Sequence, residues 1–251
     1  MSRRELESKV AIVTGSVRGI GRATALAFAD AGASVVVNGR KSAGAADEVA
    51  RAVEDAGGRA RVHLADVSVP DRAQGLIEAA VSAFGRLDIL VNNVSHRIAK
   101  PVVETGYEEW RDVQANTVDS AFLCIREAVP HLIAAGGGSI VNIGGVSGHR
   151  GVRNRSAVAA AKAGLAGMSA ALAVELAPHN INVNCVSPGS IDNYEVAGHV
   201  PDHFRENPTP MGRMGTVEEI AAMVRHLCGP EGRYVAGQTI HVCGAWNVSI
   251  A

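Results

Sequence analysis

The segment that most constrains this chain is a glycine-rich turn near its start, Thr14-Gly-Ser-Val-Arg-Gly-Ile-Gly21. An apolar run at 10–13, which predicts a buried strand, leads into the turn, and a helical pattern over 20–31 leaves it. Such a turn lets the backbone approach a pyrophosphate, while free N–H groups and the positive end of a helix dipole face that anion. Glycines also serve ordinary tight turns, but a second strand-like run at 34–38 favours the nucleotide site. The predicted contacts are Gly15, Ser16, Arg18, Gly19, Ile20 and Gly21.

Strand-like and helical runs alternate along the whole chain. Strands are predicted at 10–13, 34–38, 61–64, 89–91, 139–143, 182–186 and 239–242, and helices near 20–31, 43–56, 71–84, 107–134, 156–177 and 216–228. Short, almost wholly apolar strands separated by helices indicate a parallel sheet covered on both faces. We therefore predict one α/β domain over 1–251, a Rossmann-type doubly wound parallel sheet of about seven strands. An aperiodic stretch near 190–212 predicts a lid.

Composition argues against several classes of partner. The net charge of −1 leaves no global positive field to recruit nucleic acid or acidic lipid. No stretch is expected to span a bilayer, and the polar start is unlike a signal peptide. The four cysteines form no Cys-x-x-Cys pair, so reduced thiols in a cytoplasmic protein are expected. The nine histidines include no ligand-spaced pair, so we expect no metal site.

The residues after the second predicted strand, Asn38-Gly39-Arg40-Lys41, bear on the choice of cofactor. An acidic side chain here binds the ribose 2′-hydroxyl of NAD, whereas arginine suits the 2′-phosphate of NADP. Gly39 supplies no carboxylate, and Arg40 supplies a planar fork of donors, to which Arg18 could add a second charge. We expect NADP(H) rather than NAD(H). The alternative is that Arg40 and Lys41 are solvated loop charges.

Polar residues also follow the third and fourth predicted strands, where ligands bind in such sheets. Asp66, followed by Val67, could accept a hydrogen bond from the adenine amino group, or it could cap the next helix. The amides of Asn92 and Asn93 could tie strand ends together near the cofactor. We therefore include Asp66, Val67 and Asn93 in the predicted cofactor site.

Together these motifs resemble the short-chain dehydrogenase/reductase family over almost the whole chain. The glycine turn is similar to the family's Thr-Gly-x-x-x-Gly-x-Gly, and Asn92-Asn-Val-Ser95 to its Asn-Asn-Ala-Gly, with the last two residues altered. Ser187-Pro-Gly-Ser-Ile191 is similar to its Pro-Gly-x-Ile, which implies that Pro188, Gly189 and Ile191 border the nicotinamide. The resemblance also implies a homotetramer, or a homodimer, built on the small-residue helix near 156–176. The alternative is an internal helix packed closely on the sheet.

The resemblance further implies a reaction chemistry, from which this chain departs. The family uses a tyrosine whose pKa is lowered by a lysine four residues on, a serine thirteen residues before the tyrosine, and a mid-helix asparagine that supports a proton-relay water. Lys162 and Asn116 match, but Val158 stands at the tyrosine position and Gly145 at the serine position. Ordinary carbonyl reduction should then lose the roughly 10²–10⁴-fold that general acid–base help provides. Lys162 still suits the nicotinamide-ribose hydroxyls.

Other residues are candidates to replace the missing acid. Tyr194 lies at the start of the predicted lid, although an apolar contact with its hydroxyl in water is the alternative. Ser147 and His149 follow the fifth strand, and a histidine can serve as an acid near neutral pH or stay solvated. The same loop carries three arginines, which suit an anionic or CoA-like substrate or are solvated: Arg150, Arg153 and Arg155.

We therefore expect an NADP(H)-dependent oxidoreductase with a relocated acid, acting on a conjugated or anionic substrate. Dienoyl-CoA reductases in the same family resemble this chain in keeping the lysine and asparagine without the tyrosine, and they reduce a conjugated C=C bond. Two alternatives stay open: a catalytically silent nucleotide-binding subunit or regulator, and a lyase or isomerase using the same pocket. Likeness of fold alone does not choose among them.

Overall fold

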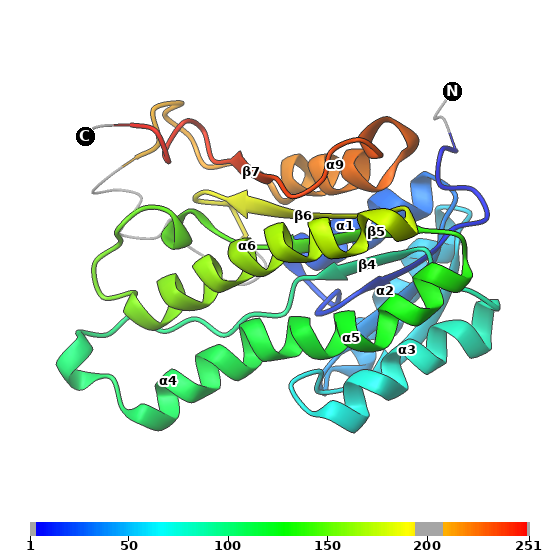
Figure 1. Cartoon of the computed structure of the whole chain (residues 1–251), viewed down its shortest axis with the longest axis horizontal. Helices are drawn as coiled ribbons and strands as arrows, with labels where there is room; N and C mark the ends of the chain where they lie inside the picture. Colours follow the sequence, from blue (N-terminus) through cyan, green and yellow to red (C-terminus); the bar gives the residue numbers. More distant parts are fainter. Residues whose placement is uncertain (1–3, 194–207, 250–251) are drawn as a thin grey trace.

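One parallel sheet organises the chain, with the strand order β3-β2-β1-β4-β5-β6-β7. The computed structural model describes residues 4–193 and 208–249 (Figure 1). Its strands are β1 (Val10–Val13), β2 (Ser34–Gly39), β3 (Arg59–Leu64), β4 (Ile89–Asn92), β5 (Gly138–Ile143), β6 (Ile181–Pro188) and β7 (Thr239–Val242). Every neighbouring pair is parallel. The predicted doubly wound α/β sheet is confirmed, with strand bounds within a few residues of those expected.

Helices cover both faces of the sheet because successive residues of its central strands are buried, and in β1 they are all apolar. In β1, Ala11 and Val13 join a core with α1 (Gly19–Asp30), α2 (Ala43–Asp55) and α9 (Val217–Cys228). Val10 and Ile12 join a second core with α3 (Pro70–Phe84), α5 (Ser120–Ala134) and α6 (Ser156–Leu176). Figure 1 shows α9 on one side of the sheet and α3 and α5 on the other. Burial on two faces explains the unbroken apolar strands.

The helix predicted over 107–134 has a break in its regular winding. It begins as α4 (Tyr107–Gln114), widens into a π-helical turn over Ala115–Asp119, and continues as α5. π-helical turns are rare in proteins, but those that do occur often lie at functional sites. Here the turn carries Asn116.

The described residues include one helix, Ser156–His179, that is long and apolar enough to cross a membrane by length and composition alone. The sequence expectation that no such stretch exists is therefore wrong on this criterion. The helix packs against β5, β6 and the turn at Val146–Gly148. Because one of its faces lies on the sheet, its apolar composition is explained by packing within the domain.

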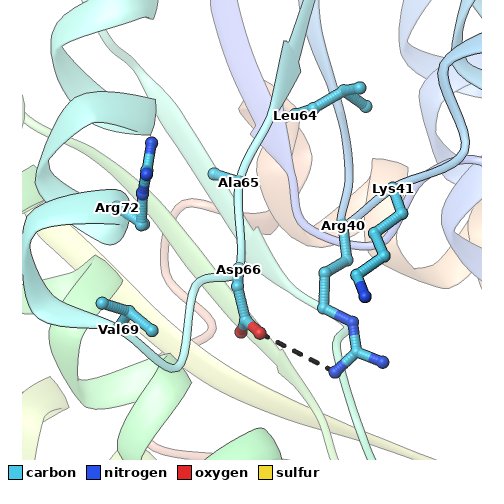
Figure 2. Close-up of a pocket in the computed structure, with 7 residues that line it drawn as sticks. All are labelled: Arg40, Lys41, Leu64, Ala65, Asp66, Val69 and Arg72. Atoms are coloured by element: carbon cyan, nitrogen blue, oxygen red, sulfur yellow. Dashed lines mark ion pairs between the residues drawn. The ribbon is translucent and has the colours of Figure 1, made fainter.

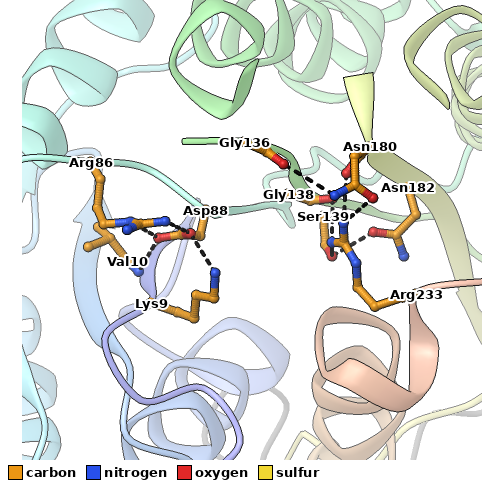
Figure 3. A network of polar contacts seen from close by, with 10 residues as sticks. All are labelled: Lys9, Val10, Arg86, Asp88, Gly136, Gly138, Ser139, Asn180, Asn182 and Arg233. Atoms are coloured by element: carbon orange, nitrogen blue, oxygen red, sulfur yellow. Dashed lines mark hydrogen bonds and ion pairs between the residues drawn. The ribbon is translucent and has the colours of Figure 1, made fainter. Parts of the chain in front are cut away.

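Polar networks close the edge of the sheet where the strands begin (Figure 3). Asp88 is 2% exposed and accepts hydrogen bonds from Lys9 Nζ at 3.0 Å, Arg86 Nη2 at 2.7 Å and the Val10 N–H at 3.0 Å. In a second network, Arg233 donates to the carbonyl oxygen of Asn180 at 2.7 Å. Burial raises the pKa of Asp88, but the hydrogen bonds from Arg86 and Lys9 lower it more, so the net shift is downward.

The strand order also fixes where a ligand can bind. From β1 the chain winds toward β3, and it then returns to add β4 through β7 on the other side, so β1 and β4 lie side by side. Their connections leave in opposite directions at the carboxyl ends, which opens a crevice there. This carboxyl edge is where the predicted site residues follow their strands.

Candidate functional site

The glycine loop between β1 and α1 has a backbone that requires glycine at several positions. Gly15 and Gly19 have φ of +61° and +55°, in the left-handed region. A Cβ on Gly21 would lie 2.4 Å from the Gly15 carbonyl oxygen, so no larger residue fits there. Helix α1 has no side-chain N-cap and no acidic residue in its first turn. Its first N–H groups are therefore left for another acceptor, as an anion site requires.

Asparagines from neighbouring strands hold this loop in place. Asn93 Nδ2 donates to the carbonyl oxygens of Thr14 at 3.0 Å and Gly15 at 3.1 Å. Asn38 Oδ1 accepts the Gly15 N–H at 3.1 Å, and its Nδ2 donates to the Ala65 carbonyl oxygen at 3.2 Å. The sequence analysis singled out Asn93 but not Asn38 as a site residue. The sequence did contain a signal for Asn38, because it is an amide near the end of β2, the strand beside the glycine loop.

A pocket of about 440 Å³ lies beyond the ends of β2 and β3 (Figure 2). Arg40 Nη1 lies 3.7 Å from Asp66 Oδ2, and Asp66 Oδ1 accepts a hydrogen bond from Ser68 Oγ at 2.6 Å. Asp66 is thus part of a local turn as well as a pocket wall. The pocket has one carboxylate and three cations, and it is lined by Arg40, Lys41, Leu64, Ala65, Asp66, Val69 and Arg72. Arg72, in the first turns of α3, was missed by the sequence analysis.

Packing at Gly39 limits what can stand at the end of β2. A Cβ on Gly39 would lie 2.6 Å from Val17 Cγ1, so an acidic side chain there has no room unless Val17 moves. Of the other predicted cofactor residues in this region, Val67 is 2% exposed and packs in the core, and Arg18 is exposed. The packing at residue 39 therefore keeps an acidic side chain out of the pocket wall, and the wall keeps its surplus of positive charge.

Lys162 brings a buried amine to the other end of the crevice. It is 6% exposed, and its Nζ donates to the Ile143 carbonyl oxygen, at the end of β5, at 2.7 Å. Burial lowers the pKa of Lys162 to about 7; the charge of Arg97 acts in the same direction, and Cys185 opposes it. An amine with this pKa exists in both protonation states near neutral pH.

The two positions that depart from the family pattern have different surroundings. Val158 is 3% exposed and packs in an apolar cluster with Val113, Ala157 and Ala161. Gly145 has room for a small side chain, because a Cβ there would make ordinary van der Waals contacts, 3.7 Å from both Lys162 Cγ and Ser147 Oγ. The crevice thus lacks a side chain at residue 145, and the Ser147 hydroxyl lies near that gap.

The remaining predicted catalytic residues are not all brought together. Asn116 Nδ2 donates to Asp112 Oδ1 at 2.8 Å, four residues back along the helix. His149 is exposed, and its ring packs edge-on against His241 with centroids 4.8 Å apart. Tyr194 lies outside the described residues. The chain's other tyrosines, Tyr107 and Tyr234, are 72% and 102% exposed.

Arg150 does not line the crevice with the rest of its loop. It donates to Ser249 Oγ at 2.9 Å and to the Trp246 carbonyl oxygen, so it binds the C-terminal segment. The sequence grouped Arg150 with Arg153 and Arg155, either at an anionic site or in a solvated or subunit-contact loop, and did not predict this contact. The sequence around Arg150 does not indicate these hydrogen bonds, because their acceptors lie far along the chain, after β7.

The segment after β6 turns back over the glycine loop. Gly189 is close-packed, because a Cβ there would lie 2.7 Å from Cys243 Cα. Ile191 forms a parallel bridge with Gly215. A Cβ on Gly19 would lie 2.7 Å from Asn193 Nδ2, so the Asn193 amide covers the start of α1. Pro188, Gly189 and Ile191 thus stand along the predicted crevice, and Asn193 is an addition that the sequence analysis missed.

Comparison with known proteins gives close matches over nearly the whole chain. A model of the family described as enoyl-(acyl carrier protein) reductase matches residues 15–247. The chain is 38% identical to cis-4-hydroxycyclohexanecarboxylate dehydrogenase of Sinomonas cyclohexanicum, over 95% of this chain and 96% of that protein. It is 36% identical to 3-oxoacyl-[acyl-carrier-protein] reductase of Thermotoga maritima, over 95% and 98%. A crystal structure of a short-chain type dehydrogenase/reductase from Mycobacterium marinum matches with a TM-score of 0.90 at 32% identity, covering 98% of each chain.

Proposed function

Because the chain belongs to the short-chain dehydrogenase/reductase family, a family of nicotinamide-dependent oxidoreductases, we propose that it is an NADP(H)-dependent member with a relocated proton donor. The observation that carries the cofactor preference is the pocket beyond β2 and β3. Arg40, Lys41 and Arg72 surround it with a single carboxylate, Asp66. A ribose 2′-phosphate is the part of NADP(H) that would be attracted by this surplus of positive charge.

The rest of the proposed cofactor site follows the carboxyl edge of the sheet. The loop from Gly15 to Gly21 and the uncapped N-terminus of α1, beside the Asn193 amide, would hold the pyrophosphate. Lys162 would bind the nicotinamide-ribose hydroxyls, and Pro188 with Gly189 would border the ring. When bound, the nicotinamide donates or accepts a hydride. Close packing at Gly21 supports this assignment, because a bulkier loop would keep the pyrophosphate away from these N–H groups.

The proposed chemistry needs a proton source other than residue 158. Ser147 is well placed to hold a substrate oxygen, because its hydroxyl lies beside the gap at Gly145 and near Lys162. Lys162, with its pKa lowered to about 7 by burial, is suited to exchange a proton near neutral pH. His149 and Tyr194 are the other proposed donors, and Asn116 would support a water in the relay. A conjugated or anionic substrate fits an active site in which the proton arrives away from residue 158.

A second candidate function is a catalytically silent nucleotide-binding subunit. It is favoured by the packing of Val158, which fills the tyrosine position with an apolar cluster, and by the exposure of Tyr107 and Tyr234. In both functions we propose a cytoplasmic homotetramer or homodimer. A lyase or isomerase in the same pocket is the remaining alternative, and it would turn over without net use of the cofactor.

Titration with NADPH and NADH, followed by nicotinamide fluorescence, tests the cofactor proposal. We expect NADPH to bind more tightly, and Arg40→Gln to weaken NADPH by about tenfold while leaving NADH nearly unchanged, because a charge-assisted bond to phosphate is lost. Arg51→Gln, an exposed arginine on α2, is the matched control and should change neither affinity. Failure to bind either cofactor would remove the oxidoreductase proposal.

The proton source is tested with a substrate screen that begins with conjugated enones and acyl-CoAs. Once a substrate is found, His149→Ala, Tyr194→Phe and Ser147→Ala are compared at saturating NADPH. Loss of a relocated acid should lower kcat by roughly 10²-fold or more in one of them. Wild-type activity in all three would contradict their proposed roles. Cofactor binding without turnover of any substrate would favour the silent subunit.

A further inference from the structure

The residues that follow β4 run along the start of α6. The Lys100 N–H donates to the Asn154 carbonyl oxygen at 2.9 Å, which joins this segment to the loop before α6. Ile98 packs against the apolar cluster that contains Val158. These contacts place the segment that carries Arg97, the residue before Ile98, beside the start of α6, whose N-cap residue is Arg155.

The charged residues of this segment are matched unequally. His96 Nδ1 lies 3.7 Å from Asp112 Oδ2, and Lys100 forms an ion pair with Glu109, both carboxylates belonging to α4. Arg97 lies between these two, and no carboxylate within 4–193 or 208–249 pairs with it. Its charge acts instead on two other cations, Arg155 and Lys162.

Arg155 is the more unusual member of this group because it is only partly exposed. Within the described residues it has neither an ion pair nor a hydrogen-bonded carboxylate. Burial and the charge of Arg97 both lower the pKa of Arg155. Arg97, Arg155 and the buried Lys162 therefore concentrate positive charge at one place beside the crevice. Burying unpaired charge is costly, and an anion bound between them would relieve that cost.

We propose that Arg97 and Arg155 form a binding site for the anionic group of the substrate, a carboxylate or a phosphate, beside Lys162. This inference rests on the proposed oxidoreductase function and names the class of substrate. Helix α6 begins directly after Arg155, and its first turn has no acidic residue and no side-chain cap, so the positive end of its dipole adds to this charge. Two guanidinium forks suit the paired oxygens of either group.

Isothermal titration of the protein saturated with NADP⁺ tests the proposal without requiring turnover. The probes are trans-cinnamate, its neutral analogue cinnamamide, and inorganic phosphate. We expect cinnamate to bind at least about tenfold more tightly than cinnamamide, because charge-assisted hydrogen bonds are available only to the anion. Arg97→Gln and Arg155→Gln should each remove about tenfold of the cinnamate affinity. Arg51→Gln changes an exposed arginine on α2, away from this segment, and should have no effect.

Each variant is also titrated with NADPH and melted, which separates the possible failures. Intact cofactor binding with equal affinity for cinnamate and cinnamamide, or an equal loss in Arg51→Gln, overturns the anion site and leaves the proposed function standing. If the protein binds neither nicotinamide cofactor, the titration is made on the protein alone; cinnamate binding that depends on both arginines then keeps the anion site and removes the proposed function. Phosphate binding that depends on both arginines also supports the site and identifies a phosphorylated substrate. Arg97 lies on an exposed segment, so Arg97→Gln remains informative if Arg155→Gln fails to fold.

Discussion

The two edges of the sheet have polar residues of the same kinds and use them in opposite ways. At the amino edge, buried Asp88 is matched by Lys9, Arg86 and a backbone N–H. At the carboxyl edge, the charge of Arg97 lowers the pKa of Arg155 after burial has done so, and no described carboxylate pairs with either arginine. The amino edge therefore satisfies its charges within the chain, whereas the carboxyl edge leaves them for a ligand.

Hydrogen bonding separates the same two edges. Buried side-chain atoms without a hydrogen-bond partner in the described residues include Asn92 Oδ1, Ser187 Oγ and His241 Nδ1. These lie at or near the carboxyl ends of β4, β6 and β7. Buried polar atoms in folded proteins are nearly always paired, so exceptions gathered at one edge mark a functional region. The difference indicates that stability and ligand binding are supplied by separate ends of the same strands.

The largest expected effect tests the amino edge. Asp88→Ala should lower the free energy of unfolding by about 2–3 kcal/mol, because it removes a buried carboxylate and leaves its donors without an acceptor. Urea denaturation at pH 7 measures this change, and Glu48→Ala, on the exposed face of α2, is the control. Because the pKa of Asp88 is lowered in the folded protein, its contribution is present above the usual carboxyl pKa and is lost as the pH falls through the lowered value. A loss of stability that persists unchanged in acid would contradict this account.

Lys162→Met tests the carboxyl edge, and the expected change in stability has the opposite sign. In the folded protein the pKa of Lys162 is about 7 rather than 10.5, so the unfolded chain binds more protons between these values. The stability of the wild type should therefore rise with pH from 7 to 10, by about 1–2 kcal/mol relative to Lys162→Met. At pH 7 the variant should unfold at a urea concentration no lower than the wild type, while its affinity for NADPH falls. A strongly destabilised variant at pH 7 would remove the distinction between the two edges.

Arg72→Gln is expected to have the smallest effect. The exposed guanidinium contributes to a phosphate site in water, so NADPH should weaken only about threefold and NADH not at all. The urea midpoint should not move, in contrast to Asp88→Ala. Fluorescence titration with both cofactors makes the measurement. A loss of stability here would mean that this pocket also supports the fold.

The sequence predicted the sheet well because every strand carries its own signal. Runs such as 10–13 and 34–38 are apolar on both faces, and the glycine turn between them admits few other structures. The break at Ala115–Asp119 was not predicted, because a single π-helical turn of five residues is too short to show its own period in the sequence.

The site was predicted where function follows strand ends and missed where it depends on contacts between distant segments. Asn93 and Arg40 stand directly after strands, so their place was readable. Arg97 was not predicted as a site residue, because the sequence does not distinguish it from its basic neighbours His96 and Lys100. Only the fold shows that those two neighbours lie beside carboxylates of α4. The contact of Arg150 with the C-terminal segment was not predicted for the same reason.

The contact between Gly39 and Val17 has a consequence for how coenzyme preference can change. A Cβ at residue 39 would lie 2.6 Å from Val17 Cγ1, so an acidic residue there collides with the glycine loop unless the Val17 side chain moves or is replaced by a smaller one. The effect of a substitution at residue 39 therefore depends on residue 17. A designer or a lineage moving this chain toward NAD(H) gains more from an acidic residue at 39 once residue 17 has been made smaller.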